Sequence, residues 1–369
     1  MRNLILKLVI SFVLCFTILN NTVEASDEVD AYIAENDEME VQTEEITEPA
    51  EIVEPVEGEV EENLEPVHEY FYDIPQSHFA YGAIERLYQL GAANYRIENK
   101  FSPDAPISRA ELIHMIIKAK GITPIDNIVP VFNDVDVNDQ YAPYIDIAHR
   151  LGMIDGVSSN EFRPGDPVRR DSLVKILVTA TGELNVMWQI DWRQRAELLA
   201  PYSDMKTVAS DSWVNHYVAY ALKNNIISGY PDNTMRVAQY TTRAEAAVLV
   251  DRLFLKDNQA VAQETLISDA AEIPIPYVKK FDMTATQYNS SEPGLSSRTS
   301  SGLTTRVGVV AVDRSVIPLG THLYIEGYGY AVAADIGGAI KGNKIDLYAS
   351  NLQEARKFGI QPVCVYVLP

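Results

Sequence analysis

The chain has 369 residues, with 52 Asp and Glu against 30 Lys and Arg, so its formal net charge is −22. This balance argues against a protein that binds nucleic acid or an anionic membrane surface, because both need an excess of Lys and Arg. The two cysteines, Cys15 and Cys364, are too few for a disulfide scaffold or a thiolate zinc cluster. At about 100–200 residues per domain, we expect two or three folded units.

Residues 1–25 have the pattern of a secretory signal peptide. A positively charged start and an almost unbroken apolar run over residues 8–19 precede Val23-Glu24-Ala25, which suits signal peptidase. The run is shorter than the roughly 20 residues that span a bilayer comfortably. We therefore expect cleavage after Ala25 and a mature, exported protein without a membrane span. The alternative is an N-terminal membrane anchor.

Residues 26–69 concentrate the negative charge. They contain 18 acidic residues and no Lys or Arg, so residues 70–369 have a formal charge of only −5. Glu-Pro pairs and mutual repulsion keep such a segment extended. We expect a disordered acidic tether, and the alternative is a ligand-binding tail.

Three matching blocks of roughly 55 residues follow, at residues 70–125, 128–185 and 198–255. Each block opens with an aromatic residue and an Asp, continues into a helical pattern, and then has a turn and a second helix. Ser108 and Thr242 are natural N-caps for the second helices. The turn residues precede an Arg at the second helix by 18 positions each time: Gly91 to Arg109, Gly152 to Arg170 and Asn225 to Arg243.

These blocks resemble surface-layer homology (SLH) repeats, whose signature is Thr-Arg-Ala-Glu at the start of the second helix. The resemblance implies an all-α bundle that holds exported proteins to secondary cell-wall polysaccharide, which is often pyruvylated. An Arg at a helix N-terminus suits a carboxylate on such a polymer. By this resemblance, three arginines bind the acidic group of the polymer: Arg109, Arg170 and Arg243. Two turn glycines, Gly156 and Gly229, let the backbone approach the sugar closely.

Two alternatives stay open for these repeats. Each Arg has the alternative role of capping its helix or pairing with Glu111 or Glu245. The second block reads Val-Arg-Arg-Asp-Ser, and Tyr95 stands where the first block would have its turn glycine. The number of active grooves is therefore open.

A second domain is expected after a polar linker at residues 256–277. From residue 278 to 369 the apolar pattern alternates, with short strands separated by Gly-rich turns and one late helix from Asn351 to Phe358. This pattern indicates a small closed all-β barrel. The expected strands are Lys280–Tyr288, Val307–Val312, His322–Glu326, Tyr330–Ala334, Lys344–Leu347 and Val363–Leu368.

Three aspartates in this domain, Asp313, Asp335 and Asp346, lie at strand ends or beside glycines. Carboxylates that cluster in a groove raise one another's pKa, which yields a protonated acid near neutral pH. Glycosidic cleavage needs such an acid at the leaving oxygen. Taken singly, an Asp beside Gly is more often a turn former.

The stretch from Thr284 to Leu368 closely resembles the 3D domain, named for three aspartates and related to the MltA-type lytic transglycosylases. The matching runs are Val-Ile-Pro-Leu-Gly-Thr, Glu-Gly-Tyr-Gly-Tyr and Gly-Gly-Ala-Ile-Lys-Gly. The resemblance implies a double-psi β-barrel that cleaves the MurNAc–GlcNAc β-1,4 bond without water, leaving a 1,6-anhydro end. This chemistry needs no metal or other cofactor.

By the same resemblance, Asp346 is the acid/base, while Asp335 and Asp313 tune its pKa and orient the substrate. Residues expected to contact substrate are Thr286, Tyr288, Thr299, Lys341, Gly337 and Gly338.

The sequence thus predicts a multidomain protein of the cell wall or S-layer surface, anchored by its repeats and cutting peptidoglycan with its barrel. The rival interpretation is a non-catalytic envelope protein whose barrel only binds glycan. The family usually has Glu and Thr where this chain has Ala334 and Ile336, which favours the rival. Ordinary hydrolysis is a third alternative and differs only in product.

Overall fold

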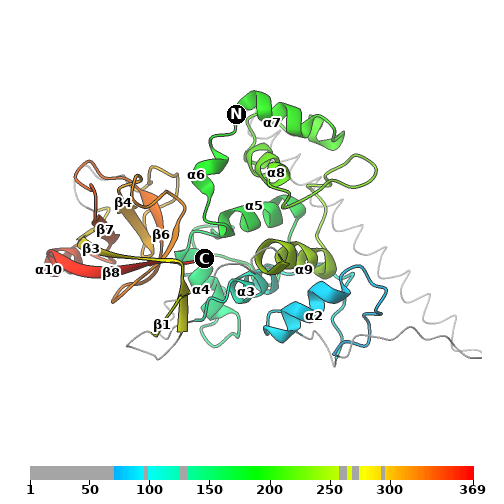
Figure 1. Ribbon diagram of the computed structural model, residues 1–369, viewed down its shortest axis with the longest axis horizontal. Helices are drawn as coiled ribbons and strands as arrows, with labels where there is room; N and C mark the ends of the chain where they lie inside the picture. The colour runs from blue at the N-terminus through cyan, green and yellow to red at the C-terminus, as the bar shows by residue number, and fades with distance from the viewer. Residues whose placement is uncertain (1–69, 95–98, 125–130, 257–263, 268–273, 292–295) are drawn as a thin grey trace, which may run out of the picture. The chain divides into compact units, whose positions relative to one another are not determined.

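The chain folds into a helical part followed by a β-barrel (Figure 1). The computed structural model describes residues 70–94, 99–124, 131–256, 264–267, 274–291 and 296–369. The signal peptide, the acidic tether and Tyr95 lie outside the described residues. Within the described part, none of the helices is both long and apolar enough to cross a bilayer.

Each repeat contributes two principal helices, as its sequence pattern predicts. The first helix of a repeat carries its apolar residues on one side, and the second begins at the repeated Arg. In chain order these helices are α2 (Tyr81–Gln89) and α3 (Arg109–Ala119), α4 (Ala142–Arg150) and α5 (Arg170–Ala180), and α8 (Trp213–Lys223) and α9 (Arg243–Asp251).

The predicted N-caps of α3 and α9 are confirmed. The Ser108 hydroxyl accepts a hydrogen bond from the Glu111 amide, and the Glu111 carboxylate accepts one from the Ser108 amide. Thr242 and Glu245 form the same reciprocal pair at α9. Such capping boxes satisfy two backbone donors that a helix leaves without partners at its start.

The three repeats pack in a closed ring. The first helix of each repeat packs against the second helix of the repeat before it, so α4 contacts α3 and α8 contacts α5. The ring closes because α2 of the first repeat packs against α9 of the third. At this closure the Arg86 guanidinium binds both carboxylate oxygens of Asp251, at 2.7 and 2.6 Å. Every repeat therefore has a neighbour on both sides.

The Asp that opens each repeat holds the turn before the second helix. Asp134 accepts hydrogen bonds from the amides of Phe162 (2.8 Å) and Arg163 (2.6 Å), and Arg163 has a positive φ of 58°. The two hydrogen bonds to the carboxylate offset the cost of a left-handed backbone conformation at a residue that has a side chain. Asp73 and Asp204 bind the corresponding amides in their repeats.

Two segments hold structure that the sequence pattern did not predict. Between the second and third repeats lie α6 (Leu184–Met187) and α7 (Trp192–Leu199), and α7 packs against α8. The expected linker at residues 256–277 contains an antiparallel ribbon of β1 (Glu264–Ile267) and β2 (Pro274–Tyr277). The prolines of β2 argue against a strand when the sequence is read alone, because proline occurs in sheets essentially only at edge strands. The remaining short helical turns are η1 (Asp204–Thr207) and η2 (Arg252–Lys256).

The C-terminal domain is the predicted closed β-barrel, with strands in the order β3-β7-β4-β6-β5-β8. The pairs β3–β7 and β4–β6 are parallel, and the other neighbouring pairs are antiparallel. All six expected strands and the late helix are present, with bounds shifted by at most two residues. They are β3 (Lys279–Tyr288), β4 (Val309–Val312), β5 (His322–Ile325), β6 (Gly329–Asp335), β7 (Lys344–Tyr348), α10 (Leu352–Phe358) and β8 (Gln361–Val367).

Alternate residues of the strands fill the barrel. The interior core includes Met283, Val310, Ala333, Ile345 and Val365, all of them buried. Because side chains alternate between the two faces of a strand, the residues next to these in sequence lie on the outer surface of the barrel wall. That surface provides both the contact with the helices and the candidate site described below.

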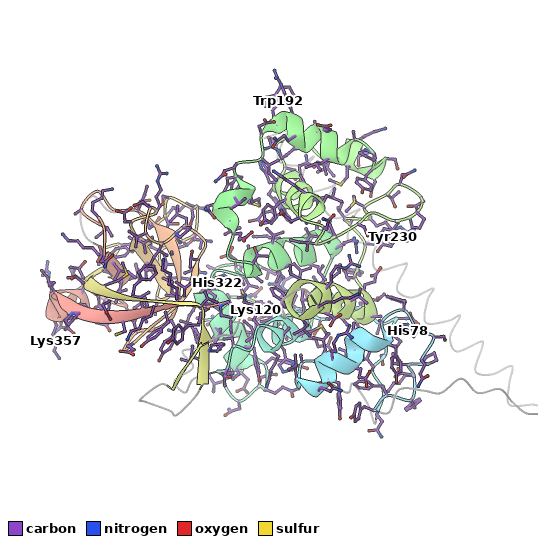
Figure 2. All side chains as sticks on the ribbon, viewed as in Figure 1. His78, Lys120, Trp192, Tyr230, His322 and Lys357 are labelled. Atoms are coloured by element: carbon purple, nitrogen blue, oxygen red, sulfur yellow. The ribbon has the colours of Figure 1, made fainter. Side chains whose placement is uncertain are left out.

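The described residues from Tyr70 onward belong to one compact unit, in which the barrel packs against the repeats. The Tyr330 hydroxyl on β6 donates a 2.8 Å hydrogen bond to the Thr123 carbonyl after α3. Figure 2 shows Lys120 and His322 near one another at this junction, where burial and then the charge of Lys120 lower the pKa of His322 well below its ordinary value. A β-carbon at Gly308 would lie 2.8 Å from the Arg150 Cα, so glycine permits this approach.

The buried His114 on α3 makes the stability of the fold depend on pH. Its ring contacts Tyr141 and Tyr144 edge-on, and burial, helped by the charge of Lys118, lowers its pKa to about 4. The unfolded chain takes up this proton below pH ~6.5, whereas the folded chain does so only near pH 4. The contribution of His114 to the free energy of unfolding is therefore fully present above pH ~6.5, and it falls by about 1.4 kcal/mol per pH unit as the pH drops toward 4.

We expect His114→Phe to remove this contribution while keeping a ring between the two tyrosines. Urea unfolding at pH 7.5 and pH 5 measures the effect. The loss of stability between these values should be smaller in the variant by about 2 kcal/mol. Equal losses in both proteins would contradict the assignment of a neutral His114 to the folded state.

Candidate functional site

The repeated arginines join each repeat to the next. Arg109 of the first repeat donates from Nε to the Phe162 carbonyl at 2.8 Å, and Arg170 of the second donates to the Ser228 carbonyl at 3.1 Å. Arg243 of the third repeat returns to the first, because its Nε donates to the Phe101 carbonyl at 2.7 Å. Each of these arginines is thus the first residue of a helix in one repeat, and its guanidinium donates to the turn of a neighbouring repeat.

The three arginines differ in what they leave accessible. Arg243 is only 3% exposed and also binds the Glu111 carboxylate and the Asn94 carbonyl. Arg170 is 7% exposed and lies over the Tyr230 ring. Arg109 is half-buried and stacks on Phe162 at 4.4 Å. Of these three side chains, Arg109 lines a surface cavity that the described residues form.

The Arg109 groove has a volume of about 150 Å³ and is lined mainly by the second repeat, with Arg109 from the first repeat and Trp213 from the third. The turn at Asp155 and Gly156 forms one side, and Lys175 and Trp213 are also part of its lining. Burial lowers the pKa of Arg109, although nearby aspartates oppose the shift, and the guanidinium stays charged at neutral pH. Two cations beside an exposed indole suit an acidic sugar, which offers a carboxylate and an apolar ring face.

The turn glycines are required by packing within their own repeats. A β-carbon at Gly229 would lie 2.0 Å from the Tyr202 ring, and one at Gly156 would lie 2.7 Å from the Phe132 ring. Tyr202 and Phe132 are the aromatic residues that open the third and second repeats. The glycines therefore let the turn lie on this ring, whatever role they also have toward a sugar.

In the barrel, Asp346 lies on the outer surface of β7. Its neighbours Ile345 and Leu347 belong to the interior core, so alternation directs Asp346 outward. Its register partner on β3 is Thr286, whose hydroxyl donates a 2.7 Å hydrogen bond to the Asp346 Oδ1. The structure therefore brings these two predicted site residues together.

A bulge in β6 brings Asp335 onto the same outer surface. Between Val310 and Ala311 the pairing skips Ala334, so that Ala311 pairs with Asp335. Ala311 also pairs with Asp346 on its other side. The two carboxylates therefore flank Ala311, and two strand spacings of about 4.8 Å separate their Cα atoms by roughly 10 Å.

Tyr288 is electrostatically coupled to both carboxylates. Burial, then the negative charges of Asp335 and Asp346, raise the pKa of its phenol, which stays protonated at neutral pH. The hydroxyl is buried and has no hydrogen-bond partner in the part of the chain that the structure describes. A buried donor of this kind needs a partner, and a bound sugar or a water can supply one.

Asp313 has a different environment from the other two aspartates. It accepts hydrogen bonds from the Ser315 hydroxyl (2.7 Å), the Ser315 amide (3.0 Å) and the Gly342 amide (2.8 Å). These bonds, with the charge of Lys341, lower the pKa of Asp313 to about 2. Asp313 is therefore ionised at neutral pH, and it ties its own turn to the glycine-rich turn before β7. The rise in pKa expected for clustered carboxylates does not apply to it.

The remaining predicted contacts belong to loops beside Asp335. Thr299 is buried, and its hydroxyl accepts a hydrogen bond from the Leu303 amide within its own turn. A β-carbon at Gly337 would lie 2.7 Å from Ile340, whereas one at Gly338 would meet open space. Gly337 thus permits a tight turn, and Gly338 leaves the surface next to Asp335 uncovered.

One contact at the candidate site was not predicted from the sequence. The amide of Ser300 donates a 2.9 Å hydrogen bond to Oδ1 of Asp335, and the Ile336 amide binds the same oxygen. Ser300 lies in the run Arg-Thr-Ser-Ser-Gly, which is typical of a turn rich in local hydrogen bonds. That composition predicts a turn but not that it contacts Asp335.

Two family descriptions match parts of the chain. Residues 70–113, 131–173 and 201–247 match the S-layer homology domain, and residues 308–369 match the 3D domain. The chain therefore carries three SLH repeats followed by a C-terminal 3D domain. With related cell-wall-binding and S-layer proteins, these matches indicate a secreted protein of the cell wall or S-layer surface.

Curated relatives resemble one part of the chain or the other. The cell wall-binding protein YocH of Bacillus subtilis is 46% identical over 94 residues, which are 24% of this chain and 33% of YocH. S-layer protein EA1 of Bacillus anthracis is 26% identical over 210 residues, or 56% of this chain and 23% of that protein. Exoglucanase XynX of Acetivibrio thermocellus is 29% identical over 51% of this chain and 16% of its own length. The chain thus spans a third or less of each of these relatives.

Solved structures of the lytic transglycosylase MltA of Escherichia coli are also similar. One is 32% identical over 20% of this chain and 27% of that chain, with a TM-score of 0.17. Another, with bound chitohexaose, is 21% identical over 35% of each chain, also at a TM-score of 0.17. A TM-score this low does not establish a shared fold.

The packing role of the turn glycine can be tested in the second repeat. Gly156→Ala should lower the free energy of unfolding by about 1–3 kcal/mol, because the new methyl group overlaps Phe132 and two backbone carbonyls. Gly165→Ala is the matched control, since a β-carbon there meets nothing within 4 Å. Urea unfolding at pH 7.5 measures both variants. Similar stabilities for the two variants would show that the ring contact does not require glycine.

Proposed function

We propose that the SLH repeats hold this protein to the cell wall and that its barrel cleaves peptidoglycan as a lytic transglycosylase. The 3D-domain match supports this activity, and one observation carries it. Asp346 and Asp335 lie on the same outer surface of the barrel, coupled to the protonated phenol of Tyr288. We also infer that the barrel is of the double-psi type, which its two parallel strand pairs support.

Asp346 is the proposed acid/base. In its protonated form it gives its proton to the glycosidic oxygen between MurNAc and GlcNAc as that bond breaks. The resulting carboxylate then accepts the proton of the MurNAc 6-hydroxyl, whose oxygen bonds to C1 and closes the 1,6-anhydro ring. No water is consumed, and Asp346 ends protonated again. The Thr286 hydroxyl holds its Oδ1 throughout.

Asp335 and Tyr288 are proposed to position the sugars. The amides of Ser300 and Ile336 fix the Asp335 carboxylate, which lies one strand beyond Ala311. At roughly 10 Å between Cα atoms, the two aspartates address different parts of a ligand instead of sharing one proton. The Tyr288 phenol supplies a donor for a sugar oxygen.

A non-catalytic glycan-binding barrel is the second candidate, and the region around the β6 bulge favours it. Ala334 is 1% exposed and packs with Val309 and Val332, so no carboxylate stands beside Asp335 at that position. Ile336 is exposed where the family usually has Thr. Both changes remove polar groups next to the proposed site.

Wall binding is proposed for the Arg109 groove. Arg109 provides the charge for an acidic group of the secondary wall polysaccharide, Lys175, which lies 3.8 Å from Asp155, adds to it, and the Trp213 ring provides an apolar surface for the sugar. Arg170 and Arg243 are both buried, and each donates to a carbonyl in the turn of a neighbouring repeat. The Arg109 groove is therefore the one to which we assign the polymer.

Asp346→Asn should reduce the formation of anhydro products by at least about 100-fold, because amide nitrogen cannot supply the acidic proton. Asp313→Asn should retain them, since Asp313 binds loop amides. Mass spectrometry of peptidoglycan digested by the full mature chain measures both. Reducing ends from the unaltered protein would indicate a hydrolase, and the absence of products would indicate a binding protein. If Asp346→Asn formed anhydro products as fast as the unaltered protein, Asp346 would not be the acid.

Arg109→Ala should weaken binding to purified cell walls by at least about tenfold, because a charge-assisted hydrogen bond contributes roughly 1.5–3 kcal/mol and 1.4 kcal/mol corresponds to tenfold. Lys175→Gln, a half-exposed change in the same groove, tests the site with less risk to folding. Arg163→Ala is the control, since this exposed side chain pairs with Glu161 outside the groove. Co-sedimentation measures the three variants. If Arg109→Ala and Lys175→Gln both bound cell walls as well as the unaltered protein, the wall polymer would not bind in the Arg109 groove.

A further inference from the structure

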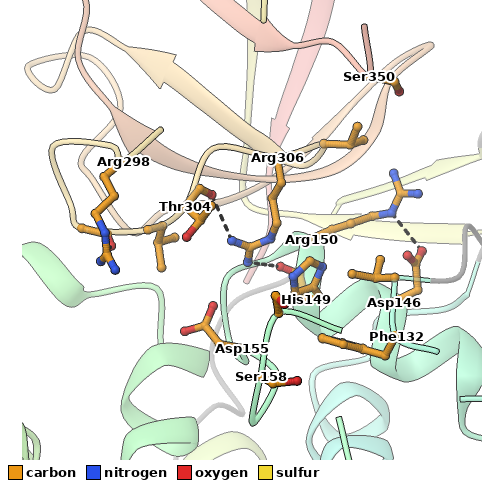
Figure 3. A pocket seen from close by; sticks show the side chains of 16 residues that line it. Phe132, Asp146, His149, Arg150, Asp155, Ser158, Arg298, Thr304, Arg306 and Ser350 are labelled. Carbon is orange, nitrogen blue, oxygen red and sulfur yellow. Dashed lines mark hydrogen bonds and ion pairs between the residues drawn. The ribbon is translucent and has the colours of Figure 1, made fainter. Parts of the chain in front are cut away.

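A second and larger cavity lies where the second repeat meets the barrel (Figure 3). Its volume is about 640 Å³, which is enough for one or two sugar units. The repeat contributes the end of α4 at His149 and the turn from Asp155 to Ser159. The barrel contributes the loops that carry Arg298 and Arg306. This cavity lies apart from Asp335 and Asp346 of the barrel, and it adjoins the Arg109 groove across the turn at Asp155 and Gly156.

The charged residues of this cavity leave two cations without a carboxylate. Arg150 is paired with Asp146 at 2.9 Å, and Asp155 lies 3.8 Å from Lys175. Among the described residues, neither Arg298 nor Arg306 has a carboxylate within ion-pair distance. Asp155 acts on Arg306 only from farther away. The barrel side of the cavity therefore has an uncompensated positive charge.

Arg306 is the more buried of these cations, and burial lowers its pKa. Its two terminal nitrogens donate to the His149 carbonyl at 2.7 Å and to the Thr304 carbonyl at 3.2 Å. Its Nε is buried and has no partner in the described structure, and the same is true of the His149 Nδ1. A buried charge and buried polar atoms without partners are costly, so such a site favours a ligand that supplies them.

We propose that this cavity binds an anionic saccharide, with the anion on Arg298 and Arg306 and the sugar ring against Phe132 and Leu303. Guanidinium groups bind carboxylates and phosphates through paired donors, and each terminal nitrogen of Arg306 has a second N–H beyond the one that it gives to a carbonyl. Thr304 also lines the cavity, and the Ser158 hydroxyl, which accepts hydrogen bonds from the Asn160 and Glu161 amides, keeps its own proton to donate to a sugar oxygen. A carboxylate-bearing wall sugar is the occupant that this lining fits, and a phosphate-bearing polymer presents the same chemistry.

The cavity shares Asp155 and Gly156 with the Arg109 groove. One turn thus separates two binding sites, and a wall polymer in the groove can continue into the junction. A ligand in the junction contacts both the repeat and the barrel, so it holds the barrel in place on the anchored repeats. This inference goes beyond wall anchoring and does not depend on whether the barrel cleaves glycan.

The test uses N-acetylmuramic acid and N-acetylglucosamine, which differ by the carboxylate-bearing lactyl group. In calorimetric titrations of the full mature chain, N-acetylmuramic acid should bind at least about tenfold more tightly. Arg298→Ala should weaken its binding by about fivefold or more, and Arg306→Gln should weaken it further. Arg356→Ala is the matched control, because it removes an exposed charge of the same barrel outside the cavity. Circular dichroism verifies that each variant is folded.

Three results would overturn the proposal. One is equal affinity for the two sugars, and another is unchanged affinity in both Arg298→Ala and Arg306→Gln. The third is loss of binding in Asp346→Asn but not in Arg298→Ala, which would move the ligand to the outer surface of β7. Inorganic phosphate that competes more strongly than N-acetylmuramic acid would support the anion site and assign it to a phosphate-bearing polymer. Wall binding by Arg109→Ala reports separately on the groove.

Discussion

The helical part of the molecule depends on a hydrogen bond that passes from each repeat to the next. The Arg at the start of a second helix donates to a carbonyl in the following turn, and the third Arg returns to the first repeat. The bond needs a helix that starts at the right residue and a turn fixed by the opening Asp, and all three repeats provide these two parts. In the second and third repeats a glycine also lets the turn lie on a ring, whereas the first repeat has Tyr95 at that position and still accepts the bond of Arg243. The groove and the junction cavity both form at the turn that receives Arg109.

Local sequence signals predicted the elements well, and their long-range partners poorly. The capping boxes at Ser108 and Thr242 and the six barrel strands follow from spacing and composition within a few residues. The burial of Arg243 does not, because its acceptors lie more than 130 residues away in the first repeat. A cation at a helix start suggests a ligand site until the neighbour that covers it is known.

The barrel site shows the same limit in another form. Alternation predicts that Asp346 faces outward, but it places Asp335 on the opposite face of its strand. The bulge at Ala334 reverses that direction, and a bulge of this kind depends on pairing with β4 instead of on the residues of β6 alone. The ionised state of Asp313 also depends on an amide from a distant turn, that of Gly342. Chemistry at the ends of strands is therefore set by neighbours that spacing alone does not identify.

The closed ring also has a consequence for how such a protein changes in evolution. An open solenoid can gain or lose a unit, because its end units have one free side. Here the first and last repeats bind each other through Arg86 and Asp251 and through Arg243, so neither side is free. Deleting one unit would leave buried guanidinium donors without acceptors, and adding one would find no surface to join. The closed ring therefore requires all three repeats together, and a change in one groove need not alter the contacts that close it.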